Sequence, residues 1–251
     1  IIDQGTDTSQ PWFAGGSIAV EGCFTIQGPG VRPLCGPVDP AERRLISTFG
    51  PGVAMPRLAD GRIDRREHHG TAVTGAAVGA SARADGFPRG PRGIAPDARA
   101  ITIKFIVGLP SGTVTGRLET VAGALEWLAA EQRTRPLAAV SMSFDVPTFG
   151  AGLDPTIESG SCDAIARRVS WPRRIREAIH SLVRQGVVVV ATAPNYPQQR
   201  VGFPACLSDV ITVGTATQDG RLPDDYPDWP AIDVLASGID ITLPRTNGGT
   251  A

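Results

Sequence analysis

Residues 67–75 read Glu-His-His-Gly-Thr-Ala-Val-Thr-Gly and combine histidine with a run of small residues. The pattern predicts that the imidazole of His69 lies at the mouth of a buried helix, with Gly70 and Gly75 letting neighbouring backbone come close. Such a position suits a catalytic base. Because this motif also arises by chance and most histidines are structural, its meaning depends on partners elsewhere in the chain.

Segments rich in β-branched residues alternate with helical patterns on both sides of this stretch, which is typical of a parallel sheet with crossover helices. Strands are expected to end at Asp3 and to cover residues 98–106, 137–142, 187–190, 210–214 and 232–236. Apolar residues spaced three and four apart predict helices over 116–131 and 172–185. Small residues predict a tightly packed helix over 69–79.

Residues 21–66 are rich in Gly, Pro and Arg and are expected to form a surface loop with little regular structure. A loop of this length is unusual in a compact core, so we expect an insertion with a role of its own. Residues 148–162 are likewise expected to be irregular.

The composition is that of a globular protein, with 251 residues of which 41% are hydrophobic, and one domain over 1–251 accounts for it. The 24 Lys and Arg residues balance 25 Asp and Glu residues, which argues against a nucleic-acid partner. No apolar run approaches the roughly 20 residues that span a bilayer, and no N-terminal signal segment is recognised. Residues 1–3 read as the end of a buried strand, so a leader or pro-segment is expected before them.

The four cysteines are Cys23, Cys35, Cys162 and Cys206, and they have neither CxxC spacing nor adjacent histidines. This argues against a zinc or redox motif. Two disulfides are favoured, with Cys23–Cys35 fastening a Gly/Pro-rich segment and Cys162–Cys206 closing a long loop. The alternative is free, buried thiols in a reducing compartment. Disulfides would indicate a secreted or extracytoplasmic protein.

Two segments follow expected strands and are candidates for lining a site. Residues 143–147 read Ser-Phe-Asp-Val-Pro after one strand, and residues 191–195 read Ala-Thr-Ala-Pro-Asn after another. Ligands of open α/β sheets bind outside the carboxyl ends of the strands. These segments are therefore expected to lie at the same functional edge.

Taken in order, these motifs closely resemble the subtilisin-like serine proteases, the subtilases of peptidase family S8, over nearly the whole chain. Residues 1–5 resemble the motif that carries the triad aspartate, so the match falls on Asp3. Residues 69–75 are similar to the family's HGTxVxG motif, with His69 as the base. Ala72 departs from this pattern, since the family usually has a second histidine there. The order Asp, His, Ser is that of the subtilisins.

The resemblance implies a three-layer α/β/α fold with a mostly parallel central sheet, and a serine endopeptidase that forms an acyl-enzyme. His69 would take the proton of a serine hydroxyl, while the buried carboxylate of Asp3 holds the imidazole in the right tautomer and stabilises its cation. Asn195 matches the oxyanion-hole asparagine. Pro194 replaces the glycine usual before it and restricts the backbone there. The implied partners are a peptide or protein substrate and a pro-segment.

The nucleophile position departs most sharply from the family. Residues 249–251 read Gly-Thr-Ala and match the serine motif, so Ala251 stands where serine is expected and has no nucleophilic group. An inactivating Ser→Ala substitution is favoured, because Asp3, His69 and Asn195 are kept together. A natural pseudoprotease that binds peptides or a pro-segment, and a sequence that merely stops here, are the alternatives. The family's next helix is absent, so the sequence is expected to be incomplete at both ends.

Two segments are expected to bind substrate. Residues 140–143 resemble the family's substrate-lining segment, and Asp145 stands where the family commonly has glycine in the pocket wall. A carboxylate there would favour a basic residue before the scissile bond, unless it faces outward from a loop. Residues 112–116 offer an edge for an extended peptide. The candidate substrate-binding residues are Gly112, Thr115, Gly116, Ser141, Met142, Ser143, Phe144 and Asp145.

No cofactor is required for this chemistry and no metal site is predicted. Trp12 lies about where the family has an acid that ligates a structural calcium, so that calcium site is not expected, while calcium elsewhere stays open. An esterase of the α/β-hydrolase type is excluded, since such enzymes carry an early GxSxG elbow and none occurs here. His68 and His180 are expected to have no catalytic role.

Overall fold

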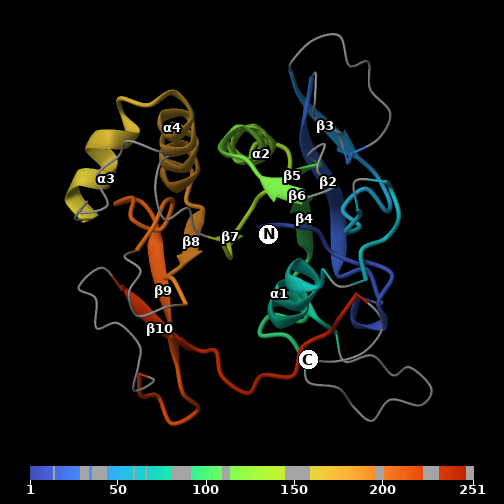
Figure 1. The fold of residues 1–251 in the computed structure, drawn as a ribbon. Helices are drawn as coiled ribbons and strands as arrows, with labels where there is room; N and C mark the ends of the chain where they lie inside the picture. Colours follow the sequence, from blue (N-terminus) through green and yellow to red (C-terminus); the bar gives the residue numbers. More distant parts are fainter. Residues whose placement is uncertain are drawn as a thin grey trace. The chain divides into compact units, whose positions relative to one another are not determined.

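The computed structural model describes residues 1–13, 15–28, 34–35, 44–58, 60–65, 67–80, 92–108, 114–144, 159–195, 201–222 and 232–246. The chain divides into two compact units, one formed by Ile1–Ala124 with Thr242–Ala251 and the other by Leu125–Ile241. Figure 1 shows their helices and strands. Each unit is described by itself below.

The first unit contains four strands that lie side by side in the order β1, β4, β2, β3. β1 (Ile2–Asp3) and β2 (Ile18–Gln27) both run parallel to β4 (Ala100–Lys104), and β3 (Arg44–Phe49) runs antiparallel to β2. All five residues of β4 are buried, as expected for a strand of a parallel sheet covered on both faces. Asp3 pairs with Lys104, so the two lie side by side at the carboxyl ends of their strands.

The prediction of a surface loop over residues 21–66 was wrong for the two segments that form most of β2 and all of β3. The Gly, Pro and Arg content of the whole stretch concealed two apolar runs. β2 is held by pairing with β4 and β3 by pairing with β2, and both pack on a helix: a side chain at Gly123 would meet the side chains of Leu45 and Phe24. Tertiary contact, which composition does not report, therefore selects strand here.

Helix α1 (His69–Val78) confirms the tightly packed helix expected over 69–79. It lies beside the short 3₁₀ helix η1 (Pro11–Phe13). A Cβ atom at Gly75 would lie 2.4 Å from Pro244, and one at Gly79 would lie 2.9 Å from the ring of Trp12. The small residues of this helix are thus required by close approach of other segments.

A two-stranded ribbon and a helix complete the first unit. β5 (Ile106–Gly108) pairs antiparallel with β6 (Val114–Gly116). α2 (Leu118–Glu131) follows directly and confirms the helix expected over 116–131, although it begins two residues later and continues into the second unit. The ribbon was not predicted, because three-residue strands show too little periodicity.

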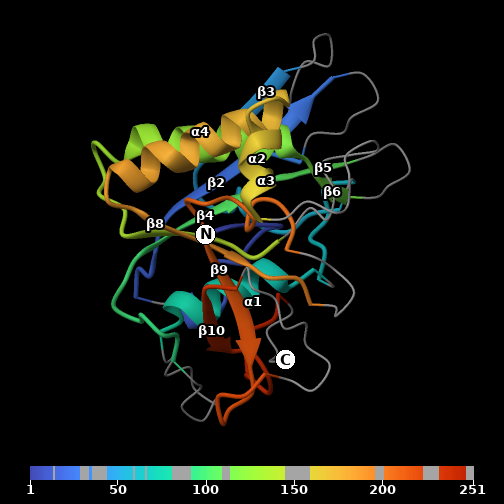
Figure 2. The ribbon, with the colours of Figure 1, turned by 90° about the vertical axis from the view of Figure 1, so that its left-hand side faces the viewer.

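The second unit contains four parallel strands in the order β7, β8, β9, β10, as Figure 2 also shows for the neighbours β9 and β10. They are β7 (Ala139–Met142), β8 (Val188–Thr192), β9 (Ile211–Ala216) and β10 (Val234–Ser237). All four confirm expected strands, with shifted ends. In β7 and β8, Met142 pairs with Ala191.

Two helices accompany these strands. α4 (Ser170–Arg184) confirms the helix expected over 172–185, and its buried residues are the apolar ones, Pro172, Ile175, Ala178, Ile179 and Leu182. Gly186 follows with a φ of 83°, a conformation that favours glycine at a helix end. α3 (Ser159–Ala166) lies partly in the stretch expected to be irregular, so that prediction was wrong from Ser159 onward.

Both predicted disulfides are confirmed, Cys23–Cys35 in the first unit and Cys162–Cys206 in the second. Beside the second bond, Asp163 accepts hydrogen bonds from Arg176 Nε at 2.7 Å and from the backbone N–H of Ser208 at 2.9 Å. The disulfide and the carboxylate together fasten α3 to α4 and to the segment around 206–208. No helix in the described ranges is long and apolar enough to cross a membrane.

Candidate active site

The first unit brings together the two residues predicted as the acid and base of a triad. Asp3 is the last residue of β1, and His69 is the first residue of α1. Nδ1 of His69 lies 2.9 Å from Oδ1 of Asp3. The side chain of Asp3 is 3% exposed, whereas that of His69 is 51% exposed. This bond engages Nδ1, so Nε2 is the ring nitrogen left for proton transfer.

Two glycines make this approach sterically possible. A Cβ atom at Gly70 would lie 2.2 Å from the carbonyl oxygen of Gly5 and 3.0 Å from Oδ1 of Asp3. Gly5 itself has a φ of 136° and would place a Cβ atom 2.8 Å from the carbonyl oxygen of Ala54. Any larger residue at Gly70 would push α1 away from the segment that carries the aspartate.

The carboxylate of Asp3 raises the pKa of His69. The hydrogen bond from the imidazole to Asp3 is the main cause; partial burial of the ring opposes it, and the negative charges of Asp3 and Glu67 add to it. Oδ1 of Asp3 also accepts the backbone N–H of Gln4 at 2.7 Å. Oδ2 is buried and has no hydrogen-bond partner among the described residues. The carboxylate is therefore held chiefly through one oxygen, which favours one orientation of the imidazole.

Two pairs of buried threonine hydroxyls lie in the same unit and were not predicted. Oγ1 of Thr6 and Oγ1 of Thr74 are 3.1 Å apart, as are Oγ1 of Thr71 and Oγ1 of Thr246. Thr71 also accepts the backbone N–H of Asp7 at 2.9 Å. The signal in the sequence was the two threonines of the 67–75 motif, which are polar in a run of small residues. The hydroxyls join the segment after Asp3, helix α1 and the segment at 246.

Lys104, the neighbour of Asp3 in the sheet, is the only lysine of the chain and is fully buried. Its Nζ donates to the carbonyl oxygen of Met55 at 2.8 Å and to that of Leu34 at 3.2 Å. Burial is the main cause that lowers its pKa to about 7; Arg57 lowers it further and Glu21 acts in the opposite direction. The amine thereby fastens Leu34 and Met55 to the end of β4.

In the second unit, two predicted segments follow neighbouring strand ends. Ser143 and Phe144 come directly after β7, and Asn195 comes three residues after β8. Asn195 is exposed, while Ser141, Ser143 and Phe144 are half-buried. Met142 is fully buried, so a substrate-lining role would fall to its backbone.

Two further predicted substrate residues, Thr115 and Gly116, lie in β6. Thr115 is half-buried and Gly116 is exposed. A Cβ atom at Gly116 would meet the ring of Phe105 at 2.5 Å, which explains glycine there. Gly112, Asp145 and Ala251 lie outside the described residues.

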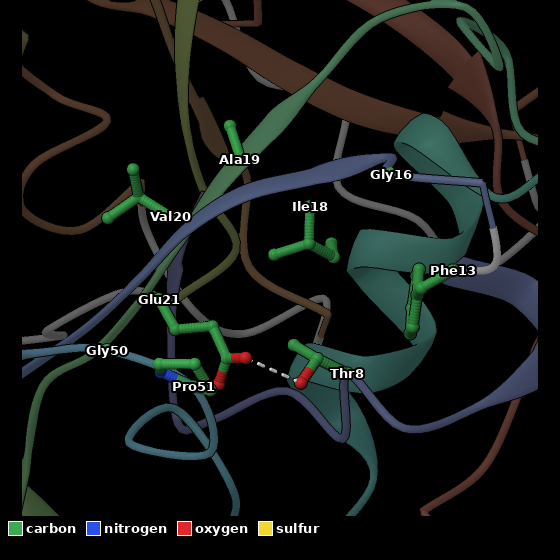
Figure 3. Close-up of a pocket in the computed structure, with 9 residues that line it drawn as sticks. All are labelled: Thr8, Phe13, Gly16, Ile18, Ala19, Val20, Glu21, Gly50 and Pro51. Atoms are coloured by element: carbon green, nitrogen blue, oxygen red, sulfur yellow. Dashed lines mark hydrogen bonds between the residues drawn. The ribbon is translucent and has the colours of Figure 1, made fainter.

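A pocket of about 330 Å³ lies elsewhere in the first unit and contains none of the predicted site residues. Figure 3 shows Glu21 at this pocket, with its carboxylate accepting a hydrogen bond from Thr8 at 2.8 Å. The other carboxylate oxygen accepts the backbone N–H of Gly52 at 2.9 Å. Because both oxygens are engaged, Glu21 serves to hold the loop at 50–54. The described residues include no group of three or more His, Cys, Asp or Glu placed for a metal ion.

The architecture is that of a subtilisin-like α/β protein. The chain is similar over its full length to the solved structure of Sphericase, with a TM-score of 0.60 and 20% identity, and covers 69% of that chain. The S41 psychrophilic protease gives a TM-score of 0.62 at 16% identity, with 100% of this chain and 68% of that chain covered. These likenesses confirm the predicted fold class, a mostly parallel sheet with helices in the three-layer α/β/α manner.

A model of the Subtilase family matches residues 1–248. The chain therefore belongs to the Subtilase family, as its motifs predict. The match ends at residue 248, before Ala251.

Curated relatives agree with this membership. A "Subtilisin-like protease 3" of Pseudogymnoascus destructans is 27% identical over 186 residues, which are 73% of this chain and 37% of the relative. A "Thermophilic serine proteinase" of a Bacillus species is 27% identical over 181 residues, which are 71% of this chain and 36% of the relative. The chain thus spans little more than a third of the length of these relatives.

Proposed function

We propose that this protein is a serine endopeptidase in which His69, oriented by Asp3, is the general base. The observation that carries the proposal is the 2.9 Å contact between His69 Nδ1 and a carboxylate that is almost fully buried. A buried carboxylate at Nδ1 selects the tautomer with a free lone pair on Nε2 and stabilises the imidazolium that forms when the base takes a proton. This is the arrangement that activates a serine hydroxyl.

In this proposal, the hydroxyl belongs at position 251, where alanine stands in place of serine. Thr246 supports this assignment, because its hydroxyl donates to the carbonyl oxygen of Glu67, two residues before the base. Five residues span at most about 17 Å, so position 251 is within reach of His69. The chain with Ala251 is then an inactivated form. The alternative is a natural pseudoprotease that binds peptides or a pro-segment.

The proposed mechanism assigns one further group to the chemistry. Nε2 of His69 accepts the proton of the serine hydroxyl as its oxygen attacks the scissile carbonyl, and later returns it to the leaving amine. The side-chain amide of Asn195 donates a hydrogen bond to the oxyanion. In subtilisin, loss of the asparagine that donates to the oxyanion lowers turnover by roughly 10²–10³. No cofactor takes part in these steps.

The substrate of the proposed enzyme is a peptide or protein. We assign its recognition to the edge of β6 at Thr115 and Gly116 and to the segment after β7. A basic residue before the scissile bond would pair with Asp145. Two disulfides, together with subtilisin-like relatives, support an extracytoplasmic location.

The Ala251→Ser variant tests the proposal. It should react with a fluorophosphonate probe and cleave fluorescent casein, whereas the parent chain and the double variant Ala251→Ser/His69→Ala should do neither at a comparable rate. A melting curve equal to that of the parent shows that each variant is folded. A folded Ala251→Ser variant without activity would contradict the assignment, and retained peptide binding by that variant would support the pseudoprotease.

A further inference from the structure

We propose that Glu67 is a positioning residue for the base, because it holds both the first residue of α1 and the segment at Thr246. This role rests on the proposed function of His69 as a base. Glu67 reaches these two partners with different groups, its carboxylate for the helix and its backbone carbonyl for the threonine. A single residue outside the triad thereby connects the base to the chain segment that leads toward position 251.

The first contact lies at the start of helix α1. Oε1 of Glu67 accepts the backbone N–H of His69 at 2.9 Å. The preceding residue, His68, makes no side-chain capping bond, and the first turn of α1 contains no acidic residue. The first N–H groups of a helix have no partner within the helix, and this carboxylate satisfies one of them. Its negative charge also interacts favourably with the positive end of the helix dipole. The bond fixes the backbone of the residue whose ring must act.

The second contact reaches the end of the described chain. Oγ1 of Thr246 lies 2.6 Å from the carbonyl oxygen of Glu67 and 3.1 Å from Oγ1 of Thr71. Thr246 is almost fully buried, so neither contact is exchanged readily for water. Its hydroxyl donates to Glu67 and accepts from Thr71, and the segment at 246 is thereby held beside the turn that enters α1.

The charge of Glu67 acts on the same imidazole. The charged groups that raise the pKa of His69 are Asp3, from the end of β1, and Glu67, from the segment that enters α1. Asp3 occupies Nδ1 through a hydrogen bond, whereas Glu67 is bonded to the backbone and acts on the ring through space. Removing the charge of Glu67 should therefore change the basicity of His69 without removing the contact that orients its ring.

Two substitutions separate the roles of Glu67. Glu67→Gln keeps a side-chain oxygen for the N–H of His69 and removes the charge, while Glu67→Ala removes both. Asp97→Asn is the matched control: Asp97 is an exposed acid two residues after Ala95, which bonds to Ala77 near the other end of α1. A ten-residue helix is about 15 Å long, well beyond the screening length of about 8 Å at physiological salt.

The readout is an NMR titration of the imidazole of His69 in the chain as it stands, which needs no nucleophile. Three histidines are present, so His68→Gln and His180→Gln suffice to assign the signals. Glu67→Gln should move the titration midpoint of His69 to lower pH, and Asp97→Asn should not. Glu67→Ala should give the same movement and, in addition, faster hydrogen exchange at the amide of His69.

Failure of the positioning role of Glu67 and failure of the proposed enzyme function give different experimental results. The positioning role is wrong if His69 has the same titration midpoint in Glu67→Gln as in Asp97→Asn. It is also wrong if the amide of His69 stays protected from hydrogen exchange in Glu67→Ala. Both conclusions hold whether or not the protein is an enzyme. If Ala251→Ser proves active, Glu67→Gln in that background should also move the acidic limb of kcat/KM to lower pH. An inactive Ala251→Ser protein would leave the titration test intact.

Discussion

Oδ1 of Asp3 and Nδ1 of His69 lie 2.9 Å apart although 66 positions separate the two residues in the sequence. The first residue ends a strand and the second begins a helix, so the contact depends on how β1 and α1 meet. Asparagine at position 3 should lower the pKa of His69, since the bond to the carboxylate is the main cause that raises it. In an Ala251→Ser background it should also lower kcat by about 10⁴, because an amide does not enforce the same tautomer.

The Asp3→Asn prediction is checked by NMR titration of His69 and by single-turnover kinetics, with Asp97→Asn as the control for loss of one negative charge. An unchanged titration midpoint would show that Asp3 does not act on the imidazole.

The same pair should make stability depend on pH in a defined direction. The pKa of His69 is higher in the folded chain than in the unfolded chain. The stabilisation of the fold by protonated His69 is therefore fully present below about pH 6.5, the pKa of histidine in the unfolded chain. It is lost as the pH rises through the higher pKa of the folded chain. We expect His69→Gln to lower the free energy of unfolding more at pH 5.5 than at pH 9. Urea denaturation at both values measures this, and an equal loss at the two would contradict the prediction.

Alanine at position 70 tests the close approach of α1 to the aspartate segment. Helix propensity alone predicts that Gly→Ala stabilises a helix by roughly 1 kcal/mol. Here the added Cβ atom would lie 2.2 Å from a backbone oxygen of Gly5, a group that cannot rotate away. Overpacking of this kind costs about 1–3 kcal/mol, so the clash should prevail and Gly70→Ala should be destabilising. The sign of the change in thermal unfolding decides between the two effects.

Lys104 should make the protein more stable as the pH rises. The pKa of this amine is about 7 in the folded chain against 10.5 as its ordinary value. Between these values the unfolded chain binds a proton that the folded chain lacks, so stability increases with pH by at most about 1.4 kcal/mol per unit. Lys104→Met should remove this slope and should cost stability at pH 9, where the carbonyl oxygens of Leu34 and Met55 lose their donor.

Unfolding curves from pH 7 to 10 measure the Lys104 slope in the parent and the variant. Because the chain has a single lysine, modification by an amine reagent gives an independent check. Rapid acylation of Lys104 in the native protein, located by peptide mapping and so distinguished from reaction at the N-terminal amine, would contradict its burial.

The two disulfides should differ in what their removal costs. Cys23 and Cys35 are 12 positions apart, and Cys162 and Cys206 are 44 apart. Chain entropy then predicts a loss of about 3 kcal/mol for Cys23→Ser/Cys35→Ser and about 4 kcal/mol for Cys162→Ser/Cys206→Ser. Denaturant unfolding of each double variant measures both losses. A larger loss at Cys23–Cys35 would mean that native packing, not loop length, governs these bonds.

Much of the fold was predictable because its strands and helices carry their own periods. The buried run in β4 and the three-and-four spacing in α4 identify those elements without reference to partners. β2, β3 and α3 were missed. In β2 and β3, packing of Phe24 and Leu45 against Gly123 supports the strands, and this contact is not visible in the sequence. Composition averaged over 21–66 could not reveal a contact with a helix far along the chain.

The sequence by itself identified the family, favoured the two disulfide pairs that the structure contains and predicted Asp3 and His69 as an acid and base, because short motifs in a fixed order can be read without knowing which segments meet. Only the tertiary structure decided that Glu67 bonds to His69 and Thr246, that threonine hydroxyls connect three segments, and that the single lysine is buried. Those relationships depend on which distant segments meet. Burial of apolar surface is what brings such segments together, and the hydrogen bonds between them depend on that packing.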